Sequence, residues 1–292
     1  MAHDHIIPRF VLKGFALNPE ASANKQEVMI YYKATKEIIK QKISAAYAIR
    51  DFNSPETETL LAKEYENKVA MIFQRIKKRA ADNEKDVVLS NEEYKLLFRF
   101  FTIMWRRNDI QLEKAKELFL NEIREFEKIL EKLSGKKAKD MLKDKYKNIS
   151  YEEMFDSKQE DLRIPLYDKI ILQTTIDDPT VQKTLTNYFP AIILNNSDTH
   201  FLLHNTYATN LHLGPVINEE YPQLMICPIS KNLCFYLMLS IEKIDLTKET
   251  YKLPIDIYSD DVIKEMFIKK YIIKTATSFV VDETNYNLIK DE

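Results

Sequence analysis

Glycine is scarce in this chain, with three residues, Gly14, Gly135 and Gly214, among 292. Globular proteins usually contain about 7% glycine. Neither a G-x-G-x-x-G motif nor a Walker A loop is present, and both need glycine where the backbone approaches a phosphate. The motifs H-E-x-x-H and G-x-S-x-G are absent too. Nucleotide binding by a glycine-rich loop is therefore excluded on motif grounds, and zincin and α/β-hydrolase chemistry have no motif support.

Cysteine is also rare. Cys227 and Cys234 are the two cysteines, and both lie in an apolar region. Free cysteine is among the most buried residue types, so we expect two buried thiols. On a single strand their odd spacing would place them on opposite faces, which argues against a disulfide, a redox pair or a zinc site.

Long apolar runs and a strong net charge are missing. The longest apolar run, around Leu233 to Leu239, is far shorter than the roughly 20 residues of a membrane-spanning helix. Residues 1–15 lack the apolar run of a leader peptide. With a net charge of -2, binding to nucleic acid would need a local patch. We expect a globular, cytoplasmic protein without membrane contact.

The first half of the chain predicts a hairpin followed by helices. Two β-rich runs, Glu27 to Tyr32 and Glu37 to Ile43, flank a short polar turn and predict antiparallel strands. Ser54 and Pro55 predict a helix start. The segment from Ser90 to Glu93 reads as a capping box that opens a second helix.

This second helix is predicted to be long. Its apolar spacing continues to Leu133, and Gly135 is a natural end. We expect a kink near Arg107 to Asp109. Residues 90–148 are predicted to form a long helical segment that could project as a subdomain of one domain, 1–292. Lys132 to Lys147 holds seven Lys and two Asp, a net +5, which predicts a solvated connector or a nucleic-acid patch.

The second half predicts short helices and then strands. The expected helices are Tyr151 to Phe155, Leu166 to Thr175 and Val181 to Tyr188. A hairpin is expected from Ala191 to Leu194 and His200 to Asn205, followed by strands Leu224 to Cys227, Leu233 to Leu239 and Phe279 to Val281, with a closing helix over Val262 to Thr277. The predicted class is α+β, with an N-terminal β hairpin, long central helices and C-terminal antiparallel strands with a closing helix.

His5 and Arg9 are the most interesting polar pair. They lie beside apolar residues that favour burial, and histidine carries protons near neutral pH while arginine binds phosphate or carboxylate. They could form a site, or they could tie the N-terminus to a helix carboxylate such as Glu66. Of the adjacent Arg106 and Arg107, we expect one to face a pocket.

Three histidines, His200, His204 and His212, lie close together in the sequence. On one strand His200 and His204 would share a face and could ligate a metal. Metal sites usually need three or four ligands, so hydrogen-bonded histidines are the other interpretation. The sequence does not indicate which cofactor, if any, the protein binds.

The opening HIIPRFVLKGF resembles the start of a bacterial family, domain of unknown function 4238, which has a pattern close to H-Y-x-P-R-F-x-L-x-x-F. The matching residues are His5, Pro8, Arg9, Phe10, Leu12 and Phe15, with Ile6 in place of the aromatic residue. Later in the chain the family tends to show a short strand, a helix with an apolar-Glu step, a helix with Gln-x-x-Arg, a Phe-x-x-Ser-Asp-x-Pro segment and a Pro-Leu-Ser strand end. In this sequence these features correspond, in order, to Val28 to Lys33, Tyr65-Glu66, Met104 to Arg107, Phe201 to Tyr207 and Pro228-Ile229-Ser230.

Two departures from the family pattern bear on chemistry. Met104 stands where the family has Gln, and His204-Asn205 stands where it has Ser-Asp. Asn205 has no ionisable proton and cannot act as a general base. The resemblance implies a stand-alone bacterial or phage-related protein, and a role in phage conflict or as a regulated toxin follows only by analogy.

Two hypotheses for function remain open. In the first, an enzyme-like protein acts on a phosphate-containing substrate such as nucleic acid, in a pocket formed by His5, Arg9, Glu66, Arg107 and Asn205. In the second, a non-catalytic protein binds a protein partner or a second copy of itself through its long helices. The apolar positions from Leu112 to Leu133 would then form the contact.

Overall fold

A computed structural model describes residues 3–50, 54–107, 109–141, 144, 147–156, 177–207, 209–211, 224–258 and 276–290. The helices are α1 Arg9–Leu12, α2 Pro55–Leu60, α3 Asn67–Ala81, α4 Asn91–Arg106, α5 Asp109–Ser134, α6 Tyr151–Asp156 and α8 Pro179–Asn187. Shorter helical segments are η1 Lys13–Phe15, the π-helical η2 Leu61–Glu66, η3 Ala138–Met141 and η5 Tyr286–Leu288. The strands are β1 His3–His5, β2 Glu27–Tyr32, β3 Glu37–Lys42, β4 Ala48–Arg50, β5 Asp86–Ser90, β6 Tyr188–Asn195, β7 Leu203–His204, β8 Thr209–Leu211, β9 Leu224–Ser230, β10 Leu233–Leu239, β11 Thr250–Tyr258 and β12 Ser278–Val281. The predicted α+β class is confirmed.

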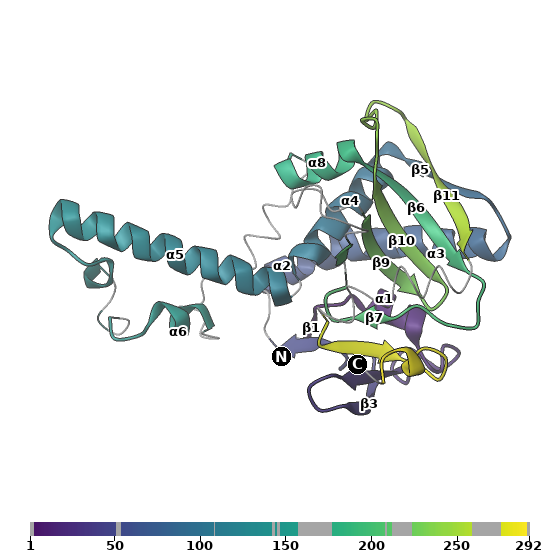
Figure 1. Cartoon of the computed structure of the whole chain (residues 1–292), viewed down its shortest axis with the longest axis horizontal. Coiled ribbons are helices and arrows are strands. Elements are labelled where there is room, and N and C mark those ends of the chain that lie inside the picture. Colours follow the sequence, from purple (N-terminus) through teal and green to yellow (C-terminus); the bar gives the residue numbers. More distant parts are fainter. Residues whose placement is uncertain are drawn as a thin grey trace.

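A four-stranded sheet, in the order β3-β2-β12-β7, joins the two ends of the chain (Figure 1). The predicted N-terminal hairpin is confirmed as β2 and β3. Strand β12, which confirms the prediction for Phe279 to Val281, pairs antiparallel with β2. Its other edge pairs with β7. This sheet therefore brings residues near 204 and 278 close to the N-terminal segment.

A six-stranded sheet, in the order β5-β11-β6-β10-β9-β8, forms the larger layer. All its pairings are antiparallel except that of β11 with β6, which is parallel. The predicted hairpin of Ala191 to Leu194 with His200 to Asn205 is wrong. β6 pairs with β10 and β11, whereas β7 belongs to the other sheet. The turn at Asn195 to Asp198 has hairpin-like composition, but it redirects the chain from one sheet to the other.

The helices α2, η2, α3 and α4 pack together against the larger sheet. Ser54 caps α2 through the Thr57 amide, with Pro55 in the first turn, and Ser90 and Glu93 form the predicted capping box of α4. Phe101 of α4 stacks on Phe235 of β10 with ring centroids 4.2 Å apart. This packing fixes α4 relative to the sheet and fixes where its C-terminal end lies.

Helix α5 extends away from the body, as Figure 1 shows. The expected break is present, because α4 ends at Arg106 and α5 begins at Asp109. Helix α6 lies beside α5, where Arg124 pairs with Glu152 at 2.7 Å. Gly135, with φ +67°, follows the last residue of α5 as predicted. That this segment forms a subdomain of a single domain stays a prediction.

The apolar core includes residues of both sheets and of the helices α3, α4 and α8. Cys227 of β9 and Cys234 of β10 lie on neighbouring strands and are both buried free thiols, as predicted. Among the described residues, no helix combines the length and apolar character needed to cross a membrane. The predicted helix Leu166 to Thr175, His212 and most of the closing helix Val262 to Thr277 lie outside the described residues.

Candidate functional site

The N-terminal segment is anchored deep in the body. Ile7, Val11, Leu12 and Phe15 are at most 2% exposed, and Phe10 packs against rings on α3 and α4. The Ile6 amide donates to the Tyr47 carbonyl at 3.0 Å. His5, the last residue of β1, is consequently held between β4 and the C-terminal end of α4.

Arg107 follows the last residue of α4, and its side chain is only 2% exposed. Its Nη2 donates to the His5 carbonyl oxygen at 3.0 Å and lies 3.9 Å from Oε1 of Glu58 on α2. A buried guanidinium needs such partners, because an uncompensated buried charge is very costly. Of the two adjacent arginines, Arg107 is the one that faces the N-terminal segment. Arg106 instead pairs with Asp178 at the start of α8, at 2.9 Å.

Glu66 is the last residue of the π-helical segment η2 and is partly buried. Burial raises the pKa of its carboxyl to about 7; the charge of Arg107 opposes this rise and that of Glu58 adds to it. Short π-helical segments are frequent at functional sites. A carboxyl that titrates near neutral pH can both accept and donate a proton under ordinary conditions.

We call His5, Glu58, Glu66 and Arg107 the Arg107 cluster. His5 takes part through its main-chain carbonyl, whereas its ring Nε2 lies 3.2 Å from the Ile43 carbonyl oxygen and donates to it in the tautomer that carries the proton there. The cluster thus combines one buried cation, two carboxyls, of which Glu66 has a raised pKa, and a histidine whose main-chain carbonyl accepts from the cation. These groups could move a proton and stabilise negative charge.

Asn205 holds the edge of the small sheet. Its side-chain oxygen accepts from the amides of Thr277, at 3.0 Å, and Ser278, at 3.4 Å. The Ser278 hydroxyl in turn donates to the hydroxyl of Tyr47, at 3.3 Å. Tyr47 has φ +51°, a strained value for a residue other than glycine. Asn205 is therefore joined to the N-terminal segment through this chain of bonds.

Arg9 stands apart from these contacts. It begins α1 with an exposed side chain, and none of the contacts described above includes it. Glu58 is the member of the Arg107 cluster that the sequence did not point to. It lies in the first turn of α2, where an acidic residue is explained by helix stability alone.

His200 and His204 lie in different surroundings. His200 precedes β7, so the two do not share a strand as expected. His204 is fully buried, which lowers its pKa to about 3, and its Nδ1 lies 2.5 Å from the Thr206 hydroxyl. Among the described residues, no three His, Cys, Asp or Glu side chains gather in a way that could hold a metal ion.

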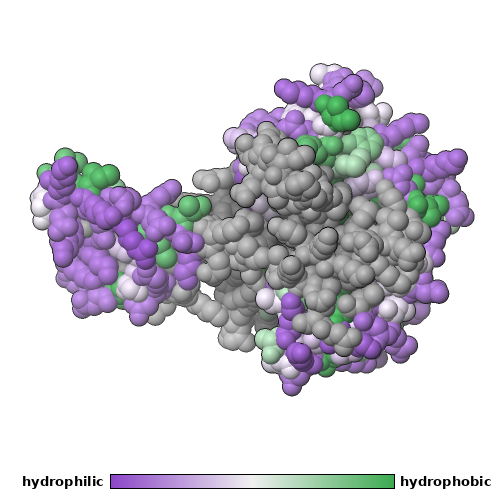
Figure 2. Space-filling view, in the orientation of Figure 1, coloured by the Kyte–Doolittle hydropathy of each residue, from purple (hydrophilic) through white to green (hydrophobic). Residues whose placement is uncertain are grey.

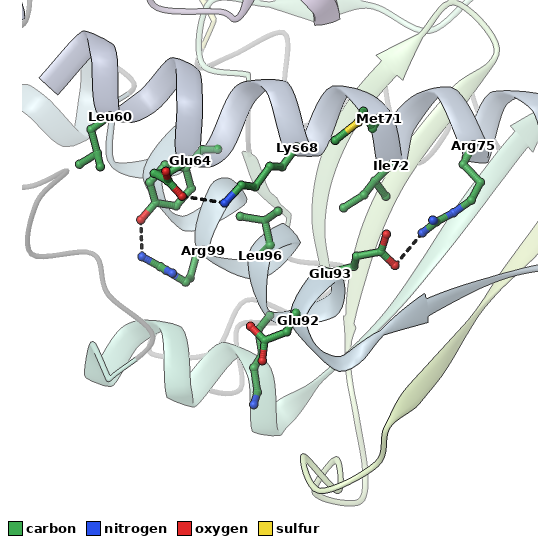
Figure 3. A pocket seen from close by; sticks show the side chains of 12 residues that line it. Leu60, Glu64, Lys68, Met71, Ile72, Arg75, Glu92, Glu93, Leu96 and Arg99 are labelled. Atoms are coloured by element: carbon green, nitrogen blue, oxygen red, sulfur yellow. Dashed lines mark hydrogen bonds and ion pairs between the residues drawn. The ribbon is translucent and has the colours of Figure 1, made fainter.

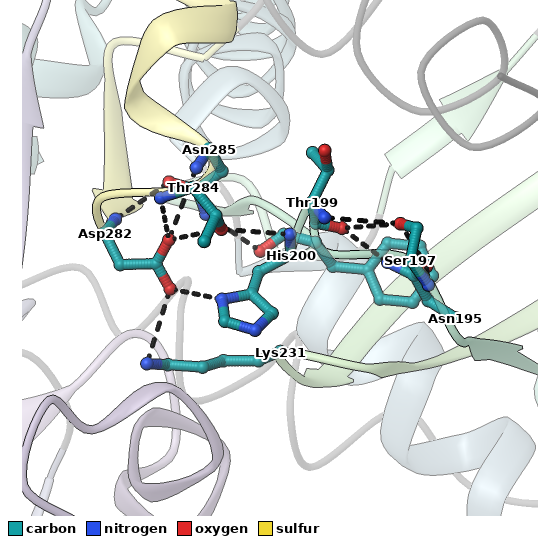
Figure 4. Close-up of polar contacts among 9 residues, drawn as sticks. Asn195, Ser197, Thr199, His200, Lys231, Asp282, Thr284 and Asn285 are labelled. Carbon is teal, nitrogen blue, oxygen red and sulfur yellow. Dashed lines mark hydrogen bonds and ion pairs between the residues drawn. The ribbon is translucent and has the colours of Figure 1, made fainter. Parts of the chain in front are cut away.

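His200 instead joins a second polar network, shown in Figure 4. Its Nδ1 lies 2.6 Å from Asp282 Oδ2, which Lys231 approaches to 3.3 Å. The other carboxylate oxygen accepts from the amide and hydroxyl of Thr284. Burial opposes ionisation of Asp282, but these hydrogen bonds and the His200 contact outweigh it and lower the pKa to about 2. The network links the turn after β6, the β9–β10 turn and the end of β12.

The lysine-rich stretch lies at the far end of α5. Lys147 pairs with Asp144 at 2.6 Å, and Lys139 lies 5.1 Å from the ring centroid of Tyr151. These two lysines thus contact their own neighbourhood. Nucleic-acid binding by this stretch stays a prediction.

The molecule is thus an α+β protein of two sheets, with a polar cluster where its N-terminal segment meets α2, η2 and α4. The family model described as a protein of unknown function (DUF4238) matches residues 3–289, and the chain belongs to this family. No curated protein and no solved structure matches it. The match covers the whole Arg107 cluster and β12.

Proposed function

We propose that this protein is an enzyme that performs acid–base chemistry at the Arg107 cluster on a phosphate-containing substrate, with nucleic acid as the first class to test. The observation that carries the proposal is Glu66, a partly buried carboxyl of pKa about 7 whose charge interacts with that of the buried Arg107. A proton carrier is most effective when its pKa is close to the working pH.

We assign the roles from residue type and from the contacts of Glu66 and Arg107 described above. In hydrolysis, the Glu66 carboxylate takes a proton from the attacking water while the phosphorus–oxygen bond to the leaving group breaks. His5, when protonated, gives a proton to the departing oxygen. Arg107 positions His5 through its carbonyl and lowers the cost of the Glu66 anion. The exposed Arg9 attracts the phosphate, and Asn205 positions the edge of the small sheet.

The test uses the full chain and a panel of single-stranded DNA, double-stranded DNA, RNA and an aryl phosphate. Glu66→Gln keeps the shape of the side chain and removes the titrating proton. We expect it to reduce turnover of the cleaved substrate by at least 100-fold. Glu64→Gln, on the same segment but in a surface ion pair with Lys68, is the matched control. Equal turnover by Glu66→Gln and wild type, or no turnover of any panel member, would contradict the proposal.

A role in phage conflict is tested in cells. Bacteria that express the wild-type chain or Glu66→Gln at equal levels are challenged with a set of phages. We expect protection, or growth arrest, with the wild type and neither with the variant. Identical plating efficiencies for both strains and an empty vector would count against this role.

A specific observation favours a second candidate function, self-association through α5. Leu118, Phe126, Ile129 and Leu133 are 56–81% exposed, and their spacing places them on one side of the helix. Figure 2 shows that this projecting part is otherwise mostly hydrophilic. An apolar stripe on a projecting helix is typical of a helix that packs against a partner.

Charge favours a second copy in antiparallel orientation. Residues 117–127 contain four Glu and one Arg, a net -3, whereas residues 128–137 contain four Lys and one Glu, a net +3. Antiparallel pairing places the acidic part of one copy opposite the basic part of the other. We expect sedimentation velocity to show a concentration-dependent dimer that Phe126→Glu converts to monomer. Ile241→Glu, which changes an exposed apolar residue elsewhere, is the control. A wild-type chain that stays monomeric at high concentration would refute this candidate.

A further inference from the structure

A groove of about 650 Å³ lies between the α2–η2–α3 stretch and α4, on a side of these helices that the Arg107 cluster does not use (Figure 3). Leu60, Ile72 and Leu96 line it with apolar surface, together with the ring of Tyr65. Sites for small organic ligands commonly have volumes of about 300–1,000 Å³ and an apolar lining with a few placed polar groups. The groove thus has room for a small molecule with an apolar body.

Most of the charges around the groove are already matched. Lys68 pairs with Glu64 at 2.6 Å and Arg75 pairs with Glu93 at 2.8 Å. These pairs stand along the walls and contribute no net charge. They fix the rim, but they give a ligand no unbalanced partner.

Arg99 differs from these cations. Its guanidinium carbon lies 5.0 Å from the ring centroid of Tyr65, and its Nη2 donates to the Tyr65 hydroxyl. No carboxylate among the described residues forms an ion pair with it, and its buried Nε has no hydrogen-bond partner in that part of the chain. Tyr65, which is 4% exposed, holds the guanidinium in place. Glu64 is close enough for its charge to interact with that of Arg99, but its ion pair is with Lys68. The groove therefore contains one fixed cation that lacks an ion-pair partner among the described residues.

The remaining lining charges, Glu92 and Lys95, lie three residues apart on α4 and cancel, so Arg99 leaves the groove with a net charge of +1. A bound anion would supply the missing charge, and charge-assisted hydrogen bonds to a fixed guanidinium are among the stronger ones. A polyanion such as nucleic acid fits less well, because three glutamates line the same groove.

We propose that this groove binds a small amphiphile with a single anionic group, in which a carboxylate or a phosphate pairs with Arg99 and an apolar body lies on Leu60, Ile72 and Leu96. The proposal does not depend on the activity of the Arg107 cluster, and its readout is binding. A carboxylate and a phosphate pair with a guanidinium in the same way. The experiment therefore includes one ligand of each kind to distinguish them.

The experiment is calorimetric titration of the full chain with decanoate and with decyl phosphate below their micelle concentrations. 1-Decanol and decylammonium serve as neutral and cationic probes of the same length. We expect at least one anion to bind with a dissociation constant below 1 mM, and the neutral and cationic probes to bind at least tenfold more weakly. No anion binding at 2 mM, or equal binding of decanol, would overturn the proposal.

Variants test the assigned cation. Arg99→Gln should weaken binding of the anion at least tenfold, whereas Arg75→Gln on the rim should change it less than threefold. Met71, whose side chain is on the rim and 63% exposed, provides a second variant that does not disturb packing. Met71→Glu should also weaken anion binding, by like-charge repulsion, and leave decanol binding unchanged. Anion binding that is unaffected by both Arg99→Gln and Met71→Glu would refute the assignment.

Discussion

The raised pKa of Glu66 predicts how the free energy of unfolding depends on pH. Its carboxyl has a pKa of about 7 in the folded protein, against an ordinary value of 4.5. The folded state therefore binds this proton more tightly than the unfolded state. The stabilising contribution of the bound proton is complete below pH 4.5 and is lost as the pH rises through about 7. Wild-type stability should decline between pH 5 and pH 8 on account of this residue.

The magnitude follows from the interval between the two pKa values. Each pH unit corresponds to about 1.4 kcal/mol, so the interval sets an upper limit of about 3 kcal/mol. Partial exposure of the side chain reduces the expected effect to about 1–2 kcal/mol. Glu66→Gln removes this titration, so the stability of the variant should decline less over this range and exceed that of wild type at pH 8.

The assay is urea unfolding followed by circular dichroism at half-unit steps from pH 5 to pH 8. Glu64→Gln is the control, since Glu64 is exposed and its pKa is lowered by Lys68, so that it titrates below this range. Glu58→Gln should shift the decline to lower pH, because the charge of Glu58 raises the pKa of Glu66. If the free energy of unfolding changed with pH by the same amount in wild type and in Glu66→Gln, Glu66 would not be buried in the way described.

Three further variants test other contacts that the structure shows. Arg107→Met leaves the His5 carbonyl without its donor and Glu58 without its nearby cation, and should lower the free energy of unfolding by about 2–4 kcal/mol at pH 7 in urea titrations; an unchanged midpoint would contradict the burial of Arg107. Gly14→Ala places a Cβ atom 2.5 Å from the Ile229 carbonyl oxygen and should cost at least about 1–3 kcal/mol, measured as a lower Tm, whereas a Tm equal to wild type would exclude this close approach. Asp282→Asn should lose about 1–2 kcal/mol at pH 7. The pKa of Asp282 lies at about 2, below its ordinary 3.8, so this contribution is present above pH 4 and is lost as the pH falls towards 2; a variant with the wild-type acid-unfolding profile would refute it.

The sequence predicted the parts of the fold that short-range physics controls. The capping box at Ser90 and Glu93, the start at Ser54 and the end at Gly135 each satisfy the backbone within a few residues, so their patterns are readable. The hairpin of β2 and β3 is local in the same sense. Strands β5 and β11 were missed, because they pair with each other across about 160 residues of chain.

In the candidate site, too, the sequence indicated some residues, whereas only the fold brings the others together. His5, Glu66 and Arg107 were named from residue type and family resemblance, and Arg107 does contact His5, although through the main chain. No local pattern could find Glu58, and none could link His200 to Asp282, 82 residues away. Arg9 was named with His5 because they are close in sequence, but the turn at Pro8 leads Arg9 to an exposed position.

By itself, the sequence determined the α+β class, the ends of the main helices and the absence of glycine-loop nucleotide motifs, because hydrophobic periodicity and capping act over short distances. The tertiary structure decided which sheet each strand joins, which of the two neighbouring arginines turns inward, and that Glu66 titrates near neutral pH. These properties depend on burial and on partners that lie far apart in the chain, and folding alone brings those partners together.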